Sequence, residues 1–163
     1  MSIKEEREEN KVRAGLHTGT NVNYLFIAFT AFTFIATINQ DLLRNNLLMT
    51  IQLVLSIPMF MSSILARAKL SEAVHTKTLR NFGSFCFITG YAFLINTVGI
   101  LVGMLVSDKI GILFFAVNIL MALAYSYIQI KLDLSRIKRR IIKDGYFILI
   151  IILLGLLPIL KIY

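Results

Sequence analysis

The stretch NFGSFCFITGYAFLINTVGILVGMLVS, residues 81–107, decides the fold of this chain because it contains no Asp, Glu, Lys or Arg. A helix rises about 1.5 Å per residue, so about 20 apolar residues cover the roughly 30 Å hydrocarbon core of a bilayer. This run is therefore long enough to cross a membrane. The other long charge-free runs are 14–40, 45–66, 110–130 and 145–160.

The composition of the chain agrees with a membrane protein. Hydrophobic residues make up 57% of the 163 residues and the mean hydropathy is +0.76, which exceeds the values typical of soluble domains. Five spans leave no room for a separate soluble domain. The apolar runs are continuous and do not alternate with period two, which disfavours a β-barrel. The sequence therefore predicts an all-α, polytopic transmembrane helical bundle of about five spans.

The domain boundaries follow from the same runs. Residues 1–21 mix Lys and Arg with Glu, unlike a cleavable signal, and are expected to form a charged cytoplasmic N-terminal arm. Residues 22–163 are expected to form the bundle. The predicted spans are about 22–38, 46–66, 82–106, 110–130 and 146–163.

Two residues are expected to interrupt helices. Pro58 lies inside the second span and should kink it, because proline removes one backbone hydrogen bond and clashes with the preceding turn. Gly145 is expected to break a helix that continues from the fourth span into the basic segment. The last span has the shortest charge-free run, so a re-entrant or interfacial helix is an alternative for it.

The positive charges alternate from one connection to the next. Fourteen of the 17 Lys and Arg lie in the N-terminal segment, between the second and third spans, or between the fourth and fifth. The other three are Arg44, Lys109 and Lys161. Because positive residues are retained on the cytoplasmic side, this predicts a cytoplasmic N-terminus and an external C-terminus. We expect the plasma membrane, which is the inner membrane in a bacterium or archaeon.

Four of the spans carry polar or small residues at helical spacing. They are Thr30, Thr33, Thr37 and Gln40 in the first span, Gln52, Ser56 and Ser63 in the second, Thr89, Asn96, Gly99 and Gly103 in the third, and Asn118, Tyr125 and Gln129 in the fourth. Such stripes can simply hold helices together, because small residues allow close approach and amides hydrogen-bond across an interface, each bond contributing about 0.6 kcal/mol.

The alternative is that these faces line a polar cavity or a pore between subunits. The candidate lining residues are Gln52, Asn96 and Asn118, because amides are costly near the bilayer centre, and Tyr125, which lies on the same stripe as Asn118. Gly99 and Gly103 form a GxxxG pattern and are candidates for helix packing, within one subunit or between two.

The cores of the predicted spans contain none of the ionisable groups of Asp, Glu, Lys or Arg. Proton relays and intramembrane hydrolases need such a group, because a neutral amide cannot store a proton or activate water. His17 lies in a charged segment without companion ligands, which favours a solvated surface residue over a metal ligand. We therefore expect no enzymatic activity, no cofactor and no metal.

The basic segment KLDLSRIKRRIIKDG, residues 131–145, is the other distinctive feature. It contains six cations against two aspartates, and each cation near an anionic membrane surface contributes about 1 kcal/mol. Retention of positive charge at the cytoplasmic face explains such a loop by itself. The alternative is that it binds anionic lipid headgroups or an acidic partner. The candidate residues for this binding are Arg136, Lys138, Arg139 and Arg140.

Two functions are compatible with these features. The first is a homo-oligomeric channel- or pore-type protein with an uncharged polar lining, since a bundle this small encloses little cavity by itself. The second is a structural or signalling membrane protein whose basic loops dock a soluble partner, an anionic ligand or a lipid headgroup. The expected partners are anionic headgroups of the bilayer and further copies of the chain. Nucleic acid is not expected, because no aromatic platform accompanies the charges.

Overall fold

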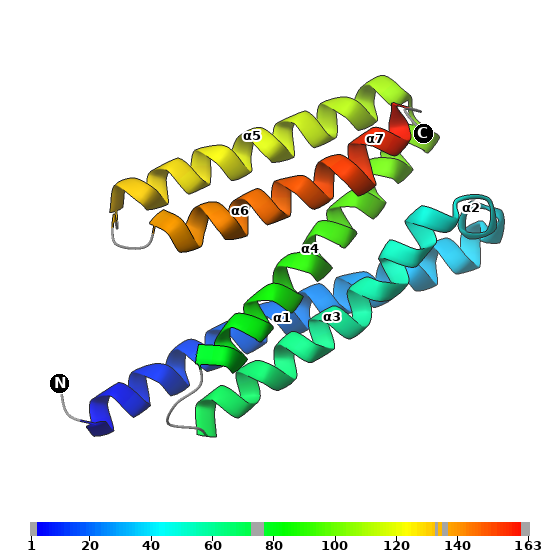
Figure 1. Cartoon of the computed structure of the whole chain (residues 1–163). Helices are drawn as coiled ribbons and strands as arrows, with labels where there is room; N and C mark the ends of the chain where they lie inside the picture. The colour runs from blue at the N-terminus through cyan, green and yellow to red at the C-terminus, as the bar shows by residue number, and fades with distance from the viewer. Residues whose placement is uncertain (1–2, 73–76, 133, 135–136, 161–163) are drawn as a thin grey trace. The chain divides into compact units, whose positions relative to one another are not determined.

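The structure is a computed structural model, which describes residues 3–72, 77–132, 134 and 137–160. Within these ranges the chain is helical almost throughout (Figure 1). Five of the helical segments there are long and apolar enough to cross a bilayer, which confirms the predicted helical fold with five candidate membrane spans. These segments are Gly15–Thr37, Leu47–Leu70, Lys77–Leu105, Asp108–Leu132 and Arg140–Ile159.

The helices differ from the predicted spans mainly at their ends. They are α1 (Ile3–Ile38), α2 (Gln40–Asn45), α3 (Leu47–Glu72), α4 (Lys77–Leu105), α5 (Asp108–Leu132), α6 (Ile137–Ile151), the π-helical segment η2 (Ile152–Leu156) and α7 (Leu157–Ile159). The N-terminal arm and the first span form one continuous helix in α1. Pro58 lies inside α3, which continues through it to Glu72.

The prediction that Gly145 breaks a helix is wrong. α5 ends at Leu132, and α6 begins at Ile137 and passes through Gly145 without interruption. A glycine inside a helix costs about 1 kcal/mol relative to alanine, which weakens a helix but does not end it. Near a membrane, continuing the helix keeps each backbone group bonded within the segment.

Side-chain caps fix the tight connections between helices. Asn46 precedes α3, and its Oδ1 accepts a hydrogen bond of 3.0 Å from the backbone N–H of Met49. Ser107 precedes α5, and its Oγ accepts one of 3.3 Å from the N–H of Ile110. Asn and Ser are favoured at this position because their oxygens satisfy N–H groups that have no partner within the helix.

The chain divides into two compact units. The first contains residues Met1–Asn45 and Leu53–Tyr91, and the second contains Asn46–Gln52 and Ala92–Tyr163. An aromatic cluster lies in the core of the first unit. The ring of Tyr91 lies 5.1 Å from that of Tyr24 and stacks on that of Phe87 at 6.0 Å.

Polar contacts also join the three long helices of the first unit. The Asn21 Nδ2 donates to the Ser63 hydroxyl at 2.7 Å, and this hydroxyl donates to the Gly83 carbonyl at 2.7 Å. Asn21 and Ser63 are almost fully buried. The Arg67 guanidinium donates to the Ser84 hydroxyl at 3.2 Å. The small hydroxyl of Ser63 therefore connects α1, α3 and α4.

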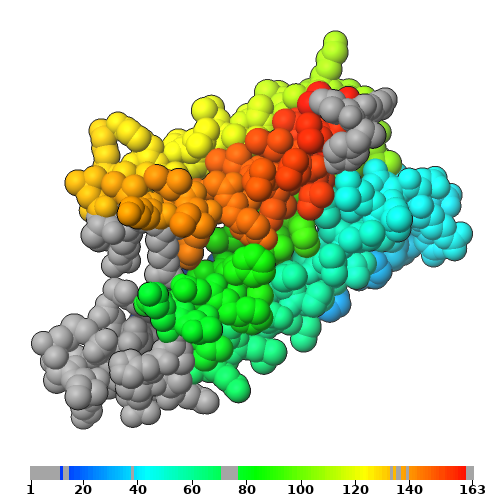
Figure 2. All heavy atoms as spheres, viewed as in Figure 1, coloured from blue at the N-terminus to red at the C-terminus, as the bar shows by residue number. Residues whose placement is uncertain are grey.

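Glycines bring the helices of the second unit close together. A Cβ added to Gly111 would lie 2.8 Å from the Cα of Gly103, so α4 and α5 touch through their backbones there. A Cβ added to Gly99 would overlap the ring of Phe115. α5 and α6 lie side by side (Figure 1), and their atoms meet along this hairpin in the space-filling view (Figure 2).

Candidate functional site

Two of the four predicted lining residues lie together in the second unit. The side chains of Gln52 and Asn96 are 2% and 0% exposed. The Asn96 Nδ2 donates a hydrogen bond of 2.7 Å to the Gln52 Oε1. The two amides come from α3 and α4, so this bond joins two predicted spans.

Both amides also bind the backbone of the last span. The Gln52 Nε2 donates to the carbonyl oxygen of Leu154 at 3.0 Å, and the Asn96 Nδ2 lies 3.3 Å from that of Ile150. The last span carries no polar stripe of its own. It takes part in the polar contacts through main-chain oxygens instead of side chains.

The sequence of the last span explains why a carbonyl is available there. Pro158 has no N–H, so it cannot donate to Leu154, the carbonyl four residues before it. The helix widens just before the proline, and the N–H of Leu157 bonds to Ile152, five residues back. Proline is tolerated in membrane helices where a neighbouring group satisfies the released carbonyl. Gln52 is that group here.

A glycine lets the amide pair reach the last span. A Cβ added to Gly155 would overlap the Asn96 Oδ1 and would lie 2.6 Å from the ring of Phe115. The Oδ1 of Asn96 accepts no hydrogen bond from the part of the chain that the structure describes. It packs directly against Gly155. The pair of amides is therefore closely surrounded by the helices that it joins.

The other two predicted lining residues lie elsewhere. Asn118 is partly buried, and its Nδ2 donates to the carbonyl of Phe114, one turn earlier in α5, at 2.8 Å. Tyr125 is 56% exposed and lies beneath Arg140 of α6. Gln52 and Asn96 therefore contact each other, whereas the contacts described for Asn118 and Tyr125 are with Phe114 and Arg140. A lining role for these residues stays a prediction.

A cationic cluster lies where the end of α5 meets the start of α6. The Arg140 guanidinium carbon lies 5.2 Å from the centre of the Tyr125 ring, and the Lys131 Nζ lies 4.8 Å from that of the Tyr127 ring. Cations over aromatic faces at such distances are attracted by the ring quadrupole. Lys138 is exposed on α6. We call Tyr125, Tyr127, Lys131, Lys138 and Arg140 the cationic cluster.

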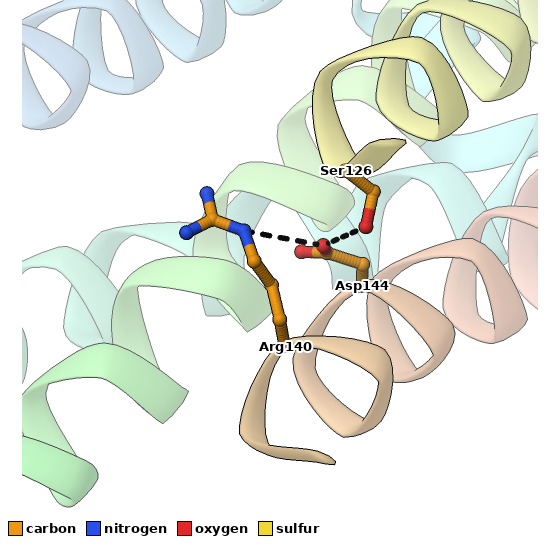
Figure 3. A network of polar contacts seen from close by, with 3 residues as sticks. All are labelled: Ser126, Arg140 and Asp144. Atoms are coloured by element: carbon orange, nitrogen blue, oxygen red, sulfur yellow. Dashed lines mark hydrogen bonds and ion pairs between the residues drawn. The ribbon is translucent and has the colours of Figure 1, made fainter. Parts of the chain in front are cut away.

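A buried serine and an aspartate adjoin this cluster (Figure 3). The Ser126 hydroxyl donates to the Asp144 Oδ2 at 2.5 Å, and the Arg140 Nε lies 3.8 Å from the same oxygen. Sequence reasoning counted Asp144 as a mere offset to the positive charge and missed Ser126. The spacing of four residues between Arg140 and Asp144 could have indicated their pairing on one helix face. No sequence signal indicates the contact with Ser126.

Two of the four predicted anion-binding residues, Arg136 and Arg139, have side chains outside the described part of the chain. Arg136 lies outside the described residues, and Arg139 lies in α6 with its side chain outside them. Of the four candidate residues, Lys138 and Arg140 are therefore the two whose side chains the structure describes. Among the described residues, no group of three or more His, Cys, Asp or Glu could hold a metal ion.

Comparison with family models, with curated proteins and with solved structures gives no match to this chain.

Proposed function

We propose that this chain is an integral membrane protein that binds anionic lipid headgroups through its cationic cluster. The observation that supports this is the placement of Arg140 and Lys131 over Tyr125 and Tyr127. Tyrosine is enriched where membrane meets water, because its ring is apolar and its hydroxyl is polar. Cations on such rings lie at the depth of the headgroups.

The charge pattern of the whole chain supports the same proposal. The cluster belongs to one of the three segments that together hold fourteen of the 17 cations, and such segments face the cytoplasm. The cytoplasmic leaflet carries anionic lipids, and each cation near it contributes about 1 kcal/mol. Lys131, Lys138 and Arg140 together therefore provide an attraction of about 3 kcal/mol.

The buried amides favour binding at the surface over a polar path through the second unit. The Asn96 amide donates to the Gln52 Oε1 and to a carbonyl of the last span, and the Gln52 amide donates to another carbonyl of that span. In this arrangement they supply packing energy, as interhelical amides commonly do.

Native mass spectrometry of the detergent-purified protein tests this proposal. We expect phosphatidylglycerol to bind more tightly than phosphatidylcholine. When Lys131, Lys138 and Arg140 are all replaced by Gln, the preference should fall on the order of a hundredfold, given about 1 kcal/mol per cation. The matched control replaces Arg44 and Lys109, exposed cations of the predicted external connections. An unchanged preference in the triple variant would refute the proposal.

A second candidate is the homo-oligomeric channel- or pore-type protein. The observation that favours it is that Thr30, Thr33 and Thr37 lie exposed on α1 and that Asn118 and Tyr125 lie on the largely exposed α5. Copies of the chain that meet at either surface would cover these polar positions, and a path between copies would be lined by them.

Liposome flux tests the channel candidate. Replacing Asn118 by Leu should abolish flux while the mass of the detergent-purified oligomer stays constant. Leu120→Val, an exposed position on the same helix, is the control. A well-folded oligomer without flux would exclude this candidate.

A further inference from the structure

We infer that Arg140 is a positioned receptor for the phosphate group of a membrane lipid, oriented by Tyr125, Asp144 and Ser126. This inference rests on the proposed function and specifies how one residue of the cationic cluster performs it. A cluster that acts by charge alone would accept Lys in place of Arg at any position. A positioned receptor would lose affinity when Lys replaces Arg, because Lys does not present the planar fork of the guanidinium.

The guanidinium of Arg140 is restrained on two sides. It lies over the Tyr125 ring, with 5.2 Å between the guanidinium carbon and the ring centre. Its Nε faces the Asp144 carboxylate at 3.8 Å. Figure 3 shows the two terminal nitrogens pointing away from Asp144. The N–H groups of these two nitrogens form the planar fork with which arginine binds two oxygens of one phosphate.

Ser126 prevents the aspartate from occupying that fork. The Ser126 hydroxyl, buried at the contact of α5 with α6, donates to the Asp144 Oδ2 at 2.5 Å. The same oxygen stays 3.8 Å from the Arg140 Nε, which is beyond hydrogen-bond distance. Without this serine, the carboxylate could turn and form a close bidentate pair with the guanidinium, which would compete with a phosphate.

The position of Arg140 along the chain indicates a lipid as the source of the phosphate. Arg140 is the first residue of the candidate span Arg140–Ile159. Tyr125 lies on α5 seven residues before its last residue, Leu132, which is about 10 Å of helix. The guanidinium therefore lies at the edge of the apolar segments, where lipid phosphates are found. Its side chain is 27% exposed, so part of it is accessible from outside the chain.

Two substitutions that leave the net charge unchanged test the inference. We expect Arg140→Lys and Ser126→Ala each to weaken phosphatidylglycerol binding about fivefold or more. Lys cannot form the bidentate bonds, and without the serine hydroxyl Asp144 competes with the phosphate for the guanidinium. Ser126→Thr keeps a hydroxyl and should restore binding. Lys109→Arg introduces a guanidinium at an exposed position outside the cationic cluster and is the matched control, with no change expected. Thermal unfolding in detergent verifies that each variant is folded.

The outcomes separate this inference from the proposed function. If Arg140→Lys and Ser126→Ala bind phosphatidylglycerol as the unmodified chain does, while the triple Gln variant loses binding, the positioned receptor is refuted and the proposed function stands. If the triple variant also retains binding, both fail. Displacement of phosphatidylglycerol by glycerol 3-phosphate at equal concentration would assign the site to a soluble phosphate ester and overturn the lipid assignment.

Discussion

The Gln52 side chain donates a hydrogen bond of 3.0 Å to the carbonyl of Leu154, an oxygen that the chain's own helix cannot satisfy because Pro158 follows four residues later. The two residues are far apart in the sequence, and their contact joins α3 to the last span. Gln52 is itself held by Asn96, so one amide pair serves three helices. The loss of this contact should therefore lower the free energy of unfolding by a measurable amount.

Gln52→Leu should destabilise the protein by about 1–3 kcal/mol, because it leaves the Leu154 carbonyl and the Asn96 amide without their partner in an apolar surrounding. Pro158→Ala supplies the missing N–H to Leu154. The cost of Gln52→Leu should therefore be smaller in the Pro158→Ala background, a coupling that a double-mutant cycle measures. Gln129→Leu, at a partly buried position of α5, is the control. Additive effects of the two substitutions would contradict this account.

Unfolding in mixed micelles with increasing denaturing detergent, followed by circular dichroism, gives the required free energies. The same assay measures the free energies of unfolding of the Gly99, Gly145 and Ser63 variants.

Gly99→Ala should destabilise the second unit by about 1–3 kcal/mol, the usual cost of overpacking a close-packed core. A Cβ added at this position would overlap the Phe115 ring. A Cβ added at Gly145 would meet no atom of another part of the chain within 4 Å. Gly145→Ala should therefore be neutral or stabilise α6 by up to about 1 kcal/mol, the helix preference of alanine over glycine. Equal effects at both positions would show that Gly99 is not needed for packing.

Ser63→Ala should destabilise the first unit by about 1–3 kcal/mol, because its hydroxyl accepts from Asn21 and donates to the Gly83 carbonyl. The neighbouring Ser62, which is only partly buried, offers a matched control through Ser62→Ala. If Ser63→Ala costs no more than Ser62→Ala, the polar contacts between α1, α3 and α4 do not contribute to stability.

The five membrane segments could be predicted from the sequence because each depends on a local property, the absence of charge over a sufficient length. The polar stripe of the second span could also be recognised, and the structure places Gln52, Ser56 and Ser63 of that stripe in buried positions. The partners of Gln52 could not be predicted in the same way. Its acceptor is a backbone oxygen on a span without polar side chains. A hydropathy pattern reports side chains only, so it does not indicate which backbone groups accept hydrogen bonds.

Two further features depend on tertiary context. Gly145 was expected to break a helix, but its intrinsic cost of about 1 kcal/mol is small beside that of exposing backbone groups near a bilayer. The contact of Ser126 with Asp144 depends on how α5 packs on α6, and helical spacing reveals only neighbours on one helix. The sequence could therefore indicate the basic segment but not the residue that holds its aspartate.

The orientation of the chain in the membrane gives the last prediction. With Cys86 replaced by Ser, cysteine can be introduced at exposed positions through Lys109→Cys or Lys138→Cys. In intact cells, a membrane-impermeant maleimide should label the variant at Lys109 and should label the variant at Lys138 only after lysis, because the basic segment is retained in the cytoplasm. Labelling at Lys138 from outside would reverse the orientation. The cationic cluster would then lie on the side opposite the anionic cytoplasmic surface on which the proposed function relies. This experiment therefore tests the proposed binding site as well as the orientation.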